Sequence, residues 1–169
     1  NNKKRLFEDK IFYTPSRKAQ FVTVKAKLPV NLPDDDYPLI LNTGRVRDQW
    51  HTMTRTGKSA RLSGHIPEPF VAINPYDALL CGVKDGGLAR VRSAWGACVV
   101  RVKVSGEQVR RSVFVPIHWN DQTASDARIG KVVNPVVDPL SGEPEFKNTP
   151  CVVEPFGVNW HGFILSRCE

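Results

Sequence analysis

The amino-acid sequence predicts a mainly β protein with a few short helices, folded as a β-barrel. Of its 169 residues, 41% are hydrophobic, which is ordinary for a globular domain and too high for a disordered chain. Thirteen prolines and twelve glycines divide the chain into short segments. In one segment Val100, Val102 and Val104 alternate with Arg101 and Lys103, the period-two pattern of a half-buried strand. Several short strands with one or two small helices describe a barrel.

Residues 1–36 are expected to form an arm and linker, and residues 37–169 the barrel. We expect a short hairpin in the arm, with strands at Lys10–Tyr13 and Ala19–Ala26 on either side of a Pro15-Ser16 turn. The second strand is indicated by alternation at Phe21, Val22 and Val24. The stretch Leu28–Asp36 is expected to be a linker, since it contains two prolines and ends in three consecutive aspartates.

The first part of the barrel is expected to contain two strands and a helix. The apolar runs Pro38–Leu41 and Phe70–Ile73 are the strands. A helix should follow over Tyr76–Cys81, because an Asn-Pro pair precedes it and Gly82 can end it. The sequence Lys84–Gly87 then predicts a turn, since it contains two glycines and an aspartate.

The rest of the barrel is expected to consist of extended segments separated by turns. In chain order the expected segments are Leu88–Ala94, Ala97–Ser105, Val109–Ile117, Val132–Val137, Thr149–Glu154 and Val158–Ser166. A second short helix is expected at Ala124–Arg128. Together with the first two strands, these segments supply enough strands to close a barrel.

A polar segment, Asn42–Leu62, follows the first expected strand and has few aliphatic side chains. It carries four arginines, one lysine and several hydroxyls, and Gly44 opens it. Guanidinium groups, hydroxyls and free backbone N–H groups are the donors that phosphate oxygens accept from, so we expect an anion-binding loop. The alternative is a solvated surface loop. Trp50 and Met53 argue against it, because large apolar side chains indicate a loop that folds back onto the protein.

The formal net charge of +7 raises the alternative of a basic barrel that binds nucleic acid or a partner protein. However, we find no recognition-helix, zinc-finger or RNA-recognition motif, and a phosphate-bearing small molecule accounts for the same charge. No apolar run approaches the roughly 18–20 residues of a membrane helix. With no signal peptide, we expect a cytoplasmic protein. Because the chain opens on Asn1 rather than methionine, we expect a piece of a longer protein.

Other polar and reactive residues are expected to be structural. The cysteines lack close-spaced pairs, so reduced thiols are expected rather than a zinc or iron–sulfur site. The histidines are far apart and are expected to be hydrogen-bonded, Asp34–Asp36 to be solvated, and Asp77 to interact with the helix dipole. The residues considered are Cys81, Cys98, Cys151, Cys168, His65, His118 and His161. No metal site and no catalytic triad is expected.

The string TGRVRDQWHTMTRTGKS, Thr43–Ser59, resembles the C-terminal molybdopterin-guanine-dinucleotide-binding domain of the molybdenum oxidoreductases. Further matches follow in order: FVAINPYDA, the turn before LARVRSAWG, DPLSGEPEFK and the closing WHGFILS. The resemblance covers nearly the whole chain. Within this superfamily, the loop and the RLFEDKIFYTP arm look most like the cytoplasmic assimilatory nitrate reductases. The fold that this implies is a double-psi β-barrel, as in the aspartate-decarboxylase-like proteins.

The resemblance also implies the residues that line the cofactor. On the TGR…WHT motif they are Thr43, Gly44, Arg45, Val46, Arg47, Asp48, Gln49, Trp50, His51 and Thr52, with Val46–Gln49 contributing their backbone. Lys147 matches a lysine that contacts a cofactor in relatives, with a solvated turn lysine as the alternative. The pterin-binding asparagine of relatives is replaced here by Gly130, and Asn134 is a weak substitute.

The resemblance finally implies a role within a larger enzyme. The cofactor would be bis-molybdopterin guanine dinucleotide, and the parent enzyme would reduce nitrate to nitrite. A formate dehydrogenase or another oxyanion reductase is the alternative. The molybdenum ligand and an iron–sulfur cluster would lie elsewhere in the parent chain, so the fragment alone is expected to be inactive. Its partners would be the remaining domains of that chain, with a redox partner for the whole enzyme.

Overall fold

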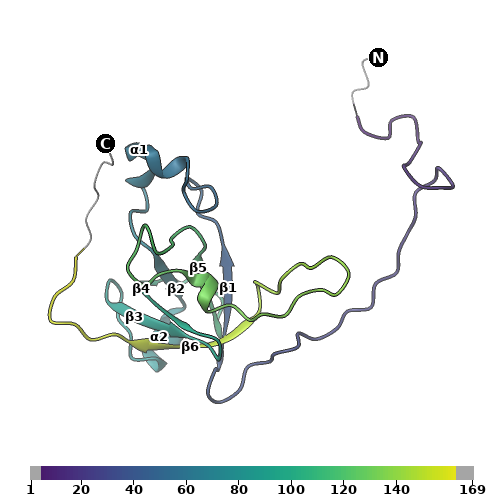
Figure 1. Ribbon diagram of the computed structural model, residues 1–169. Helices are drawn as coiled ribbons and strands as arrows, with labels where there is room; N and C mark the ends of the chain where they lie inside the picture. Colours follow the sequence, from purple (N-terminus) through teal and green to yellow (C-terminus); the bar gives the residue numbers. More distant parts are fainter. Residues whose placement is uncertain (1–4, 163–169) are drawn as a thin grey trace.

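The computed structural model describes residues 5–162 (Figure 1). Six strands form the body of the protein: β1 Leu39–Gly44, β2 Phe70–Ile73, β3 Leu88–Arg92, β4 Ala97–Val104, β5 Ser112–Pro116 and β6 Thr149–Pro155. The helices are short: α1 Ala60–Ser63, α2 Pro75–Leu80 and the 3₁₀ turns η1 Thr56–Lys58 and η2 Ile129–Lys131. None of the helices within residues 5–162 has the length and apolar character needed to cross a membrane.

The strands close into one barrel in the order β1-β5-β2-β4-β3-β6. The pairs β1–β5 and β2–β4 are parallel, and the remaining four pairs are antiparallel. The two halves of the chain are paired in the same way: if β1 is exchanged with β4, β2 with β5 and β3 with β6, every strand pair maps onto a pair of the same barrel. Each half is also interrupted by the other, since β5 separates β1 from β2 and β2 separates β4 from β5. This is a double-psi β-barrel, and the predicted fold class is confirmed.

Alternate side chains of each strand fill the barrel. Val71 lies opposite Val102, and Ile73 opposite Val113, and all four are at most 1% exposed. Burying a valine or isoleucine stabilises the folded state by roughly 1.5–3 kcal/mol, so these pairs contribute much of the stability. Figure 1 places α1 and the loop after β1 at one end of the barrel, and α2 at the other.

Helix α2 forms as its flanking residues predict. Asn74 is the N-cap, and its side chain accepts a hydrogen bond from the Tyr76 N–H at 3.0 Å. Gly82 follows the helix with a φ of 68°, a left-handed conformation that glycine adopts without strain. The dipole explanation for Asp77 is incomplete, however. Its carboxylate is 3% exposed and accepts a hydrogen bond from the Arg111 N–H at 2.5 Å.

Replacing Asp77 with alanine should lower the free energy of unfolding by about 1–3 kcal/mol, the cost of leaving a partly buried donor without an acceptor. The cost arises at Arg111, whose φ of 60° is strained for a side-chain-bearing residue and is held in place by this hydrogen bond. Urea unfolding of the 169-residue chain measures the effect. Glu107→Ala, on the exposed turn before β5, is the matched charge control and should change stability by less than about 0.5 kcal/mol. Equal effects of the two substitutions would contradict this assignment.

The predicted hairpin in the arm is wrong. Residues 5–38 contain no strand, although turns occur around Phe7 and Thr14. Phe21, Val22 and Val24 are 80–97% exposed. A two-stranded hairpin is marginal by itself, and the closed barrel has no free edge on which a third strand could pair. The arm therefore extends away from the barrel (Figure 1).

Several other expected elements also differ. Val132–Val137 is not a strand, because Pro135 cannot donate to a ladder and the Asn134 side chain bonds the Val136 N–H instead. Within that stretch only Val137 forms an isolated bridge, to Pro144. Ala124–Arg128 is not helical, since the carbonyl of Asp126 accepts a hydrogen bond from the Val99 N–H of β4.

Two boundaries in the chain also shift. The first strand does not end at Leu41, as expected, but continues through Gly44, because β5 pairs with it to that residue. Of the expected strand Val158–Ser166, residues 158–162 are irregular and the remainder lies outside the described residues.

Candidate functional site

The candidate site begins where β1 leaves the barrel. Thr43 is buried and Gly44 follows it as the last residue of the strand. A Cβ atom at Gly44 would lie 2.9 Å from Phe114 Cε2 and 3.8 Å from Lys147 Nζ. A side chain at this position would therefore push against the Phe114 ring and crowd the lysine, whereas glycine leaves the space open.

The structure brings Lys147 to this strand end across 104 positions of sequence. Its ammonium group donates a hydrogen bond to the Thr43 carbonyl, and the Thr43 hydroxyl donates one to the Phe146 carbonyl at 3.0 Å. Lys147 is exposed, so its charge also faces solvent. The arrangement places a cation beside the backbone of Gly44.

Asn134 holds the segment that carries Lys147. The residue is 1% exposed, and its amide NH₂ donates to the carbonyls of Glu145 and Asn148 at 3.3 and 3.0 Å. Its own N–H donates to Thr149 Oγ1 at 3.0 Å. Since the side chain is used inside the fold, it does not substitute for the family's asparagine. Gly130 is exposed with open space where a side chain would begin, so neither position presents an amide to a ligand.

The loop after β1 packs against the barrel through Val46, Gln49 and Met53. Val46 and Gln49 are 9% and 5% exposed, and Met53 packs against the core. Gln49 Oε1 accepts a hydrogen bond from the Thr56 hydroxyl at 2.6 Å. The side chains of Val46 and Gln49 are therefore buried in the protein, and the expected contribution of their backbone to cofactor binding stays a prediction.

His118, predicted to be a hydrogen-bonded structural histidine, lies beneath this loop and is fully buried. Its Nε2 atom accepts a hydrogen bond from the Val46 N–H at 2.9 Å. Its Nδ1 atom lies 2.6 Å from the His51 carbonyl oxygen. The structural prediction for this histidine is confirmed.

Arg45, Trp50 and His51 form the exposed edge of the loop. The Arg45 guanidinium lies 4.6 Å from the centre of the Trp50 ring, and the His51 ring contacts the same indole edge-on at 4.6 Å. Trp50 is 53% exposed, so the expectation that it folds back onto the protein is wrong for Trp50 and correct for Met53. The stacking cation keeps the indole on the surface, where it presents an aromatic face.

Arg47 and Asp48 form an ion pair with each other. Arg47 Nε donates to Asp48 at 3.1 Å, and the other oxygen of Asp48 lies 2.7 Å from His65 Nδ1. Hydrogen bonds from Arg47 and then His65 lower the pKa of Asp48 below its ordinary value. Arg47 and Asp48 therefore form a surface ion network beside the site, while Arg45, Thr52 and Lys147 remain exposed donors.

The thiols lie away from this edge. Cys98 and Cys151 are buried in the barrel, and burial raises the pKa of Cys98 to about 12. Both are therefore protonated and unreactive near neutral pH. Cys168 is outside the described residues. Within residues 5–162, no group of three or more His, Cys, Asp or Glu side chains could hold a metal ion.

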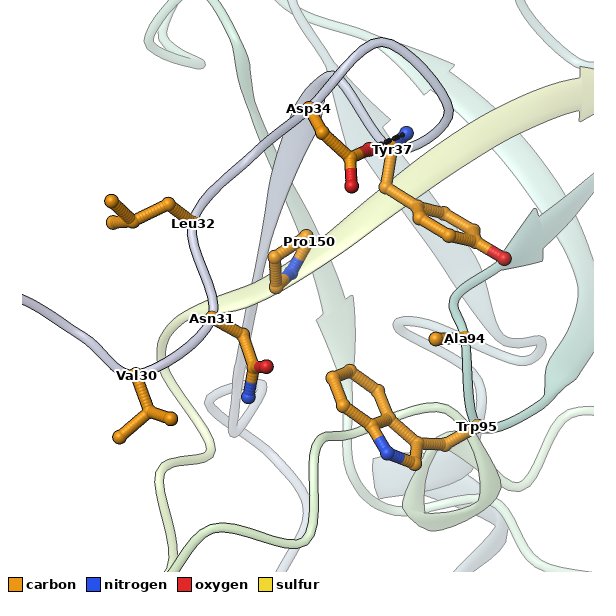
Figure 2. A pocket seen from close by; sticks show the side chains of 8 residues that line it. All are labelled: Val30, Asn31, Leu32, Asp34, Tyr37, Ala94, Trp95 and Pro150. Atoms are coloured by element: carbon orange, nitrogen blue, oxygen red, sulfur yellow. Dashed lines mark hydrogen bonds between the residues drawn. The ribbon is translucent and has the colours of Figure 1, made fainter.

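A hollow lies between the linker and the barrel (Figure 2). Its walls include Leu32, Trp95 and Pro150, and its volume of about 260 Å³ is too small for a dinucleotide. Asp34 accepts a hydrogen bond from the Tyr37 N–H at 2.7 Å, drawn as the dashed line in Figure 2, so this carboxylate caps a turn of the linker. The hollow therefore reflects how the linker packs against the barrel.

The donors at the end of β1 fit a large anionic cofactor with a planar ring system. Two exposed cations, Arg45 and Lys147, flank a backbone position without a side chain, and Trp50 offers an aromatic face. The fold and site together define a cofactor-binding β-barrel domain. The chain belongs to the "Molydopterin dinucleotide binding domain" family, which matches residues 39–150.

Relatives of known name include nitrate reductases and formate dehydrogenases. The chain is 48% identical over 134 residues to "Nitrate reductase" of Klebsiella oxytoca, covering 79% of this chain and 16% of that protein. It is 39% identical to "Assimilatory nitrate reductase catalytic subunit" of Bacillus subtilis, covering 78% and 19%. It is 33% identical to "F420-dependent formate dehydrogenase subunit alpha" of Methanocaldococcus jannaschii, covering 85% and 20%. The chain thus spans a fifth or less of the length of each of these relatives.

A solved structure shares the fold. "Acetylene Hydratase from Pelobacter acetylenicus" superimposes with a TM-score of 0.63 at 19% identity, covering 71% of this chain and 18% of that one. At this identity the likeness concerns the fold alone.

Proposed function

We propose that this domain holds bis-molybdopterin guanine dinucleotide inside a larger oxidoreductase that reduces nitrate to nitrite. The main observation behind this proposal is that Arg45, Gly44 and Lys147 lie together at one end of the barrel. The similarity to two nitrate reductases supports the choice of reaction. When bound, the cofactor supplies the molybdenum centre for oxygen-atom transfer.

The residues of this chain bind and orient that cofactor. The guanidinium of Arg45 and the ammonium of Lys147 provide positive charge for phosphate oxygens. Gly44 allows a close approach to the backbone, and Thr52 offers an exposed hydroxyl. The Trp50 indole provides a flat apolar surface on which a ring can stack. These contacts position the cofactor without taking part in bond making.

The remaining parts of the proposed enzyme lie outside this chain. They are the molybdenum ligand, an iron–sulfur cluster and the other domains that cover the barrel. A redox partner would deliver electrons, and we place the enzyme in the cytoplasm. The extended arm, with Phe21, Val22 and Val24 exposed, is suited to packing against those other domains.

A formate dehydrogenase is the second candidate, favoured by the 33% identity to the Methanocaldococcus protein. The loop is directed at the cofactor in either enzyme, so this barrel discriminates poorly between the two substrates. The reaction is therefore tested on the full-length protein.

The full-length protein, purified with its molybdenum, should reduce nitrate with a viologen dye as electron donor and should not oxidise formate. The reason is the higher identity to nitrate reductases over the same residues. Nitrite formation and dye reduction by formate are measured in parallel, with a molybdenum-free preparation as the control. Formate oxidation without nitrite formation would replace the first candidate by the second. A full-length protein that contains no pterin dinucleotide would overturn both.

A further inference from the structure

His118 contacts two residues, Val46 and His51, in the loop that carries the exposed donors. Two residues after β5, its imidazole contacts Val46 through Nε2 and His51 through Nδ1, at 2.9 and 2.6 Å. Val46 and His51 enclose Gln49 and Trp50, so the imidazole closes this part of the loop into a ring. Arg45 immediately precedes it.

The two hydrogen bonds define one protonation state. An N–H of Val46 can donate only to an unprotonated Nε2, and a carbonyl of His51 can accept only from a protonated Nδ1. His118 is therefore neutral with its proton on Nδ1. Burial lowers its pKa below the ordinary value of 6.5, against the opposing effect of the bond to His51. The charges of Arg45 and His51, which face it, lower the pKa further.

The hydrogen bond from His118 is accepted by His51, a residue whose backbone conformation is strained. His51 has a φ of 44° and Met53 a φ of 63°, both in the left-handed region that side-chain-bearing residues rarely occupy. Such a conformation costs roughly 1–3 kcal/mol and persists only when neighbouring contacts enforce it. The His51 carbonyl is held by a buried donor at this strained position. The strain turns the loop so that Trp50 and His51 lie on the surface beside Arg45.

We propose that His118 is the positioning residue of this site, holding the loop from Val46 to His51 in the one conformation that presents Arg45, Trp50 and His51 to the cofactor. The inference rests on the proposed function for the identity of the ligand, but the loop geometry does not depend on it. An imidazolium cannot accept the Val46 N–H, so protonation releases one end of the loop. The loop should therefore be fully held above pH 6.5, the ordinary value for histidine, and loosen as pH falls below it.

Two substitutions separate the two bonds. In His118→Asn the amide reaches the position of Nδ1, so the bond to His51 can persist while Val46 loses its acceptor. In His118→Gln the amide reaches the position of Nε2, so the bond to Val46 can persist while that to His51 is lost. His65→Gln is the control, because His65 is exposed and contacts the same loop through Asp48.

The experiment is amide hydrogen exchange on the full-length protein from pH 5 to 8, with rates corrected to protection factors. In the wild type we expect protection of Val46–Thr52 to fall below pH 6.5 while the six strands stay protected. His118→Asn should lower loop protection about tenfold at pH 7.5, as expected for one lost hydrogen bond, and remove the pH dependence. His118→Gln should retain protection at the Val46 amide and lower it at the Met53 amide, because the bond of Met53 to the Trp50 carbonyl lies in the turn that the His51 carbonyl anchors. His65→Gln should behave as wild type.

Molybdenum and GMP retained per chain after dialysis provide the second readout. Retention should follow loop protection in the wild type and both His118 variants. Unchanged loop protection in folded His118 variants would overturn the proposal, as would loss confined to the strands. If both variants fail to fold, the wild-type pH profile decides, and a flat profile overturns the proposal. A wild type that holds no pterin dinucleotide but shows the expected loop exchange would end the proposed function and leave the role of His118 standing.

Discussion

Replacing Gly96 with alanine should lower the free energy of unfolding by about 3 kcal/mol, the upper range for forced overpacking. A Cβ atom there would lie 2.3 Å from the Lys131 carbonyl oxygen and 3.1 Å from its carbon. Both are backbone atoms, so no side chain can rotate away. The opposing segment is also fixed, because the Ser93 hydroxyl donates to the carbonyl of the buried Val132 at 2.6 Å.

Urea unfolding of the 169-residue chain measures this effect, with the Gly130→Ala variant as the control. Gly130 lies next to Lys131 in η2, and nothing lies within 4 Å of the Cβ that alanine would add. The control should change stability by less than about 1 kcal/mol. If the Gly96→Ala variant were as stable as Gly130→Ala, η2 would be able to move away from the β3–β4 turn. That result would contradict the close packing on which the prediction rests.

Replacing Arg45 with alanine should weaken binding of GDP to the 169-residue chain about ten- to hundredfold, the loss expected for a hydrogen bond to a charged group. Arg45 is exposed beside Trp50, and its guanidinium forms no ion pair within residues 5–162 that would compete for a phosphate. Amide shifts in an NMR titration with GDP measure the affinity. In the wild type, the shifts should concentrate at Thr43, Gly44, Arg45, His51 and Thr52.

Arg55→Ala is the matched control for Arg45, because Arg55 is an exposed arginine of the same loop that precedes η1. It should leave GDP affinity within about twofold, since an exposed charge at a distance is screened by salt. In the full-length protein only Arg45→Ala should lower molybdenum content. Equal effects of the two substitutions, or shifts scattered over the basic surface, would mean that the overall positive charge of the protein attracts the anion and that no specific binding site does.

Local sequence rules predicted the elements whose stability is local. Asn74 and Gly82 correctly bounded α2, because a cap and a left-handed glycine act within one helical turn. The alternation in Ala97–Ser105 correctly predicted β4. The arm, by contrast, shows the same alternation and forms no strand, because alternation specifies a strand only where a neighbouring strand is available.

The sequence also pointed to the loop of the candidate site, but not to the direction of its side chains. Its motif gave Thr43–Thr52 as one group. In the structure Val46 and Gln49 point inward, Arg47 turns to Asp48, and Arg45 and Trp50 stack on the surface. These choices depend on which side chain finds a partner in the folded protein. His118 gave no signal beyond its place after an apolar strand, so its link to the loop was not predicted.

The sequence by itself determined the helix α2 and the polar loop, since each depends on residues that are neighbours along the chain. Strand patterns predicted a barrel, and the family resemblance implied its double-psi form. Only the tertiary structure decided how residues distant in sequence meet at the site, including Lys147, which the resemblance implied as a cofactor contact without giving its neighbours. Lys147 reaches Thr43 across 104 positions because β6 pairs with β1, and Asn134 fixes the segment between them. Such contacts form only when the barrel closes, because closure offsets the entropy cost of joining distant segments. No pattern within a short window of sequence carries that information.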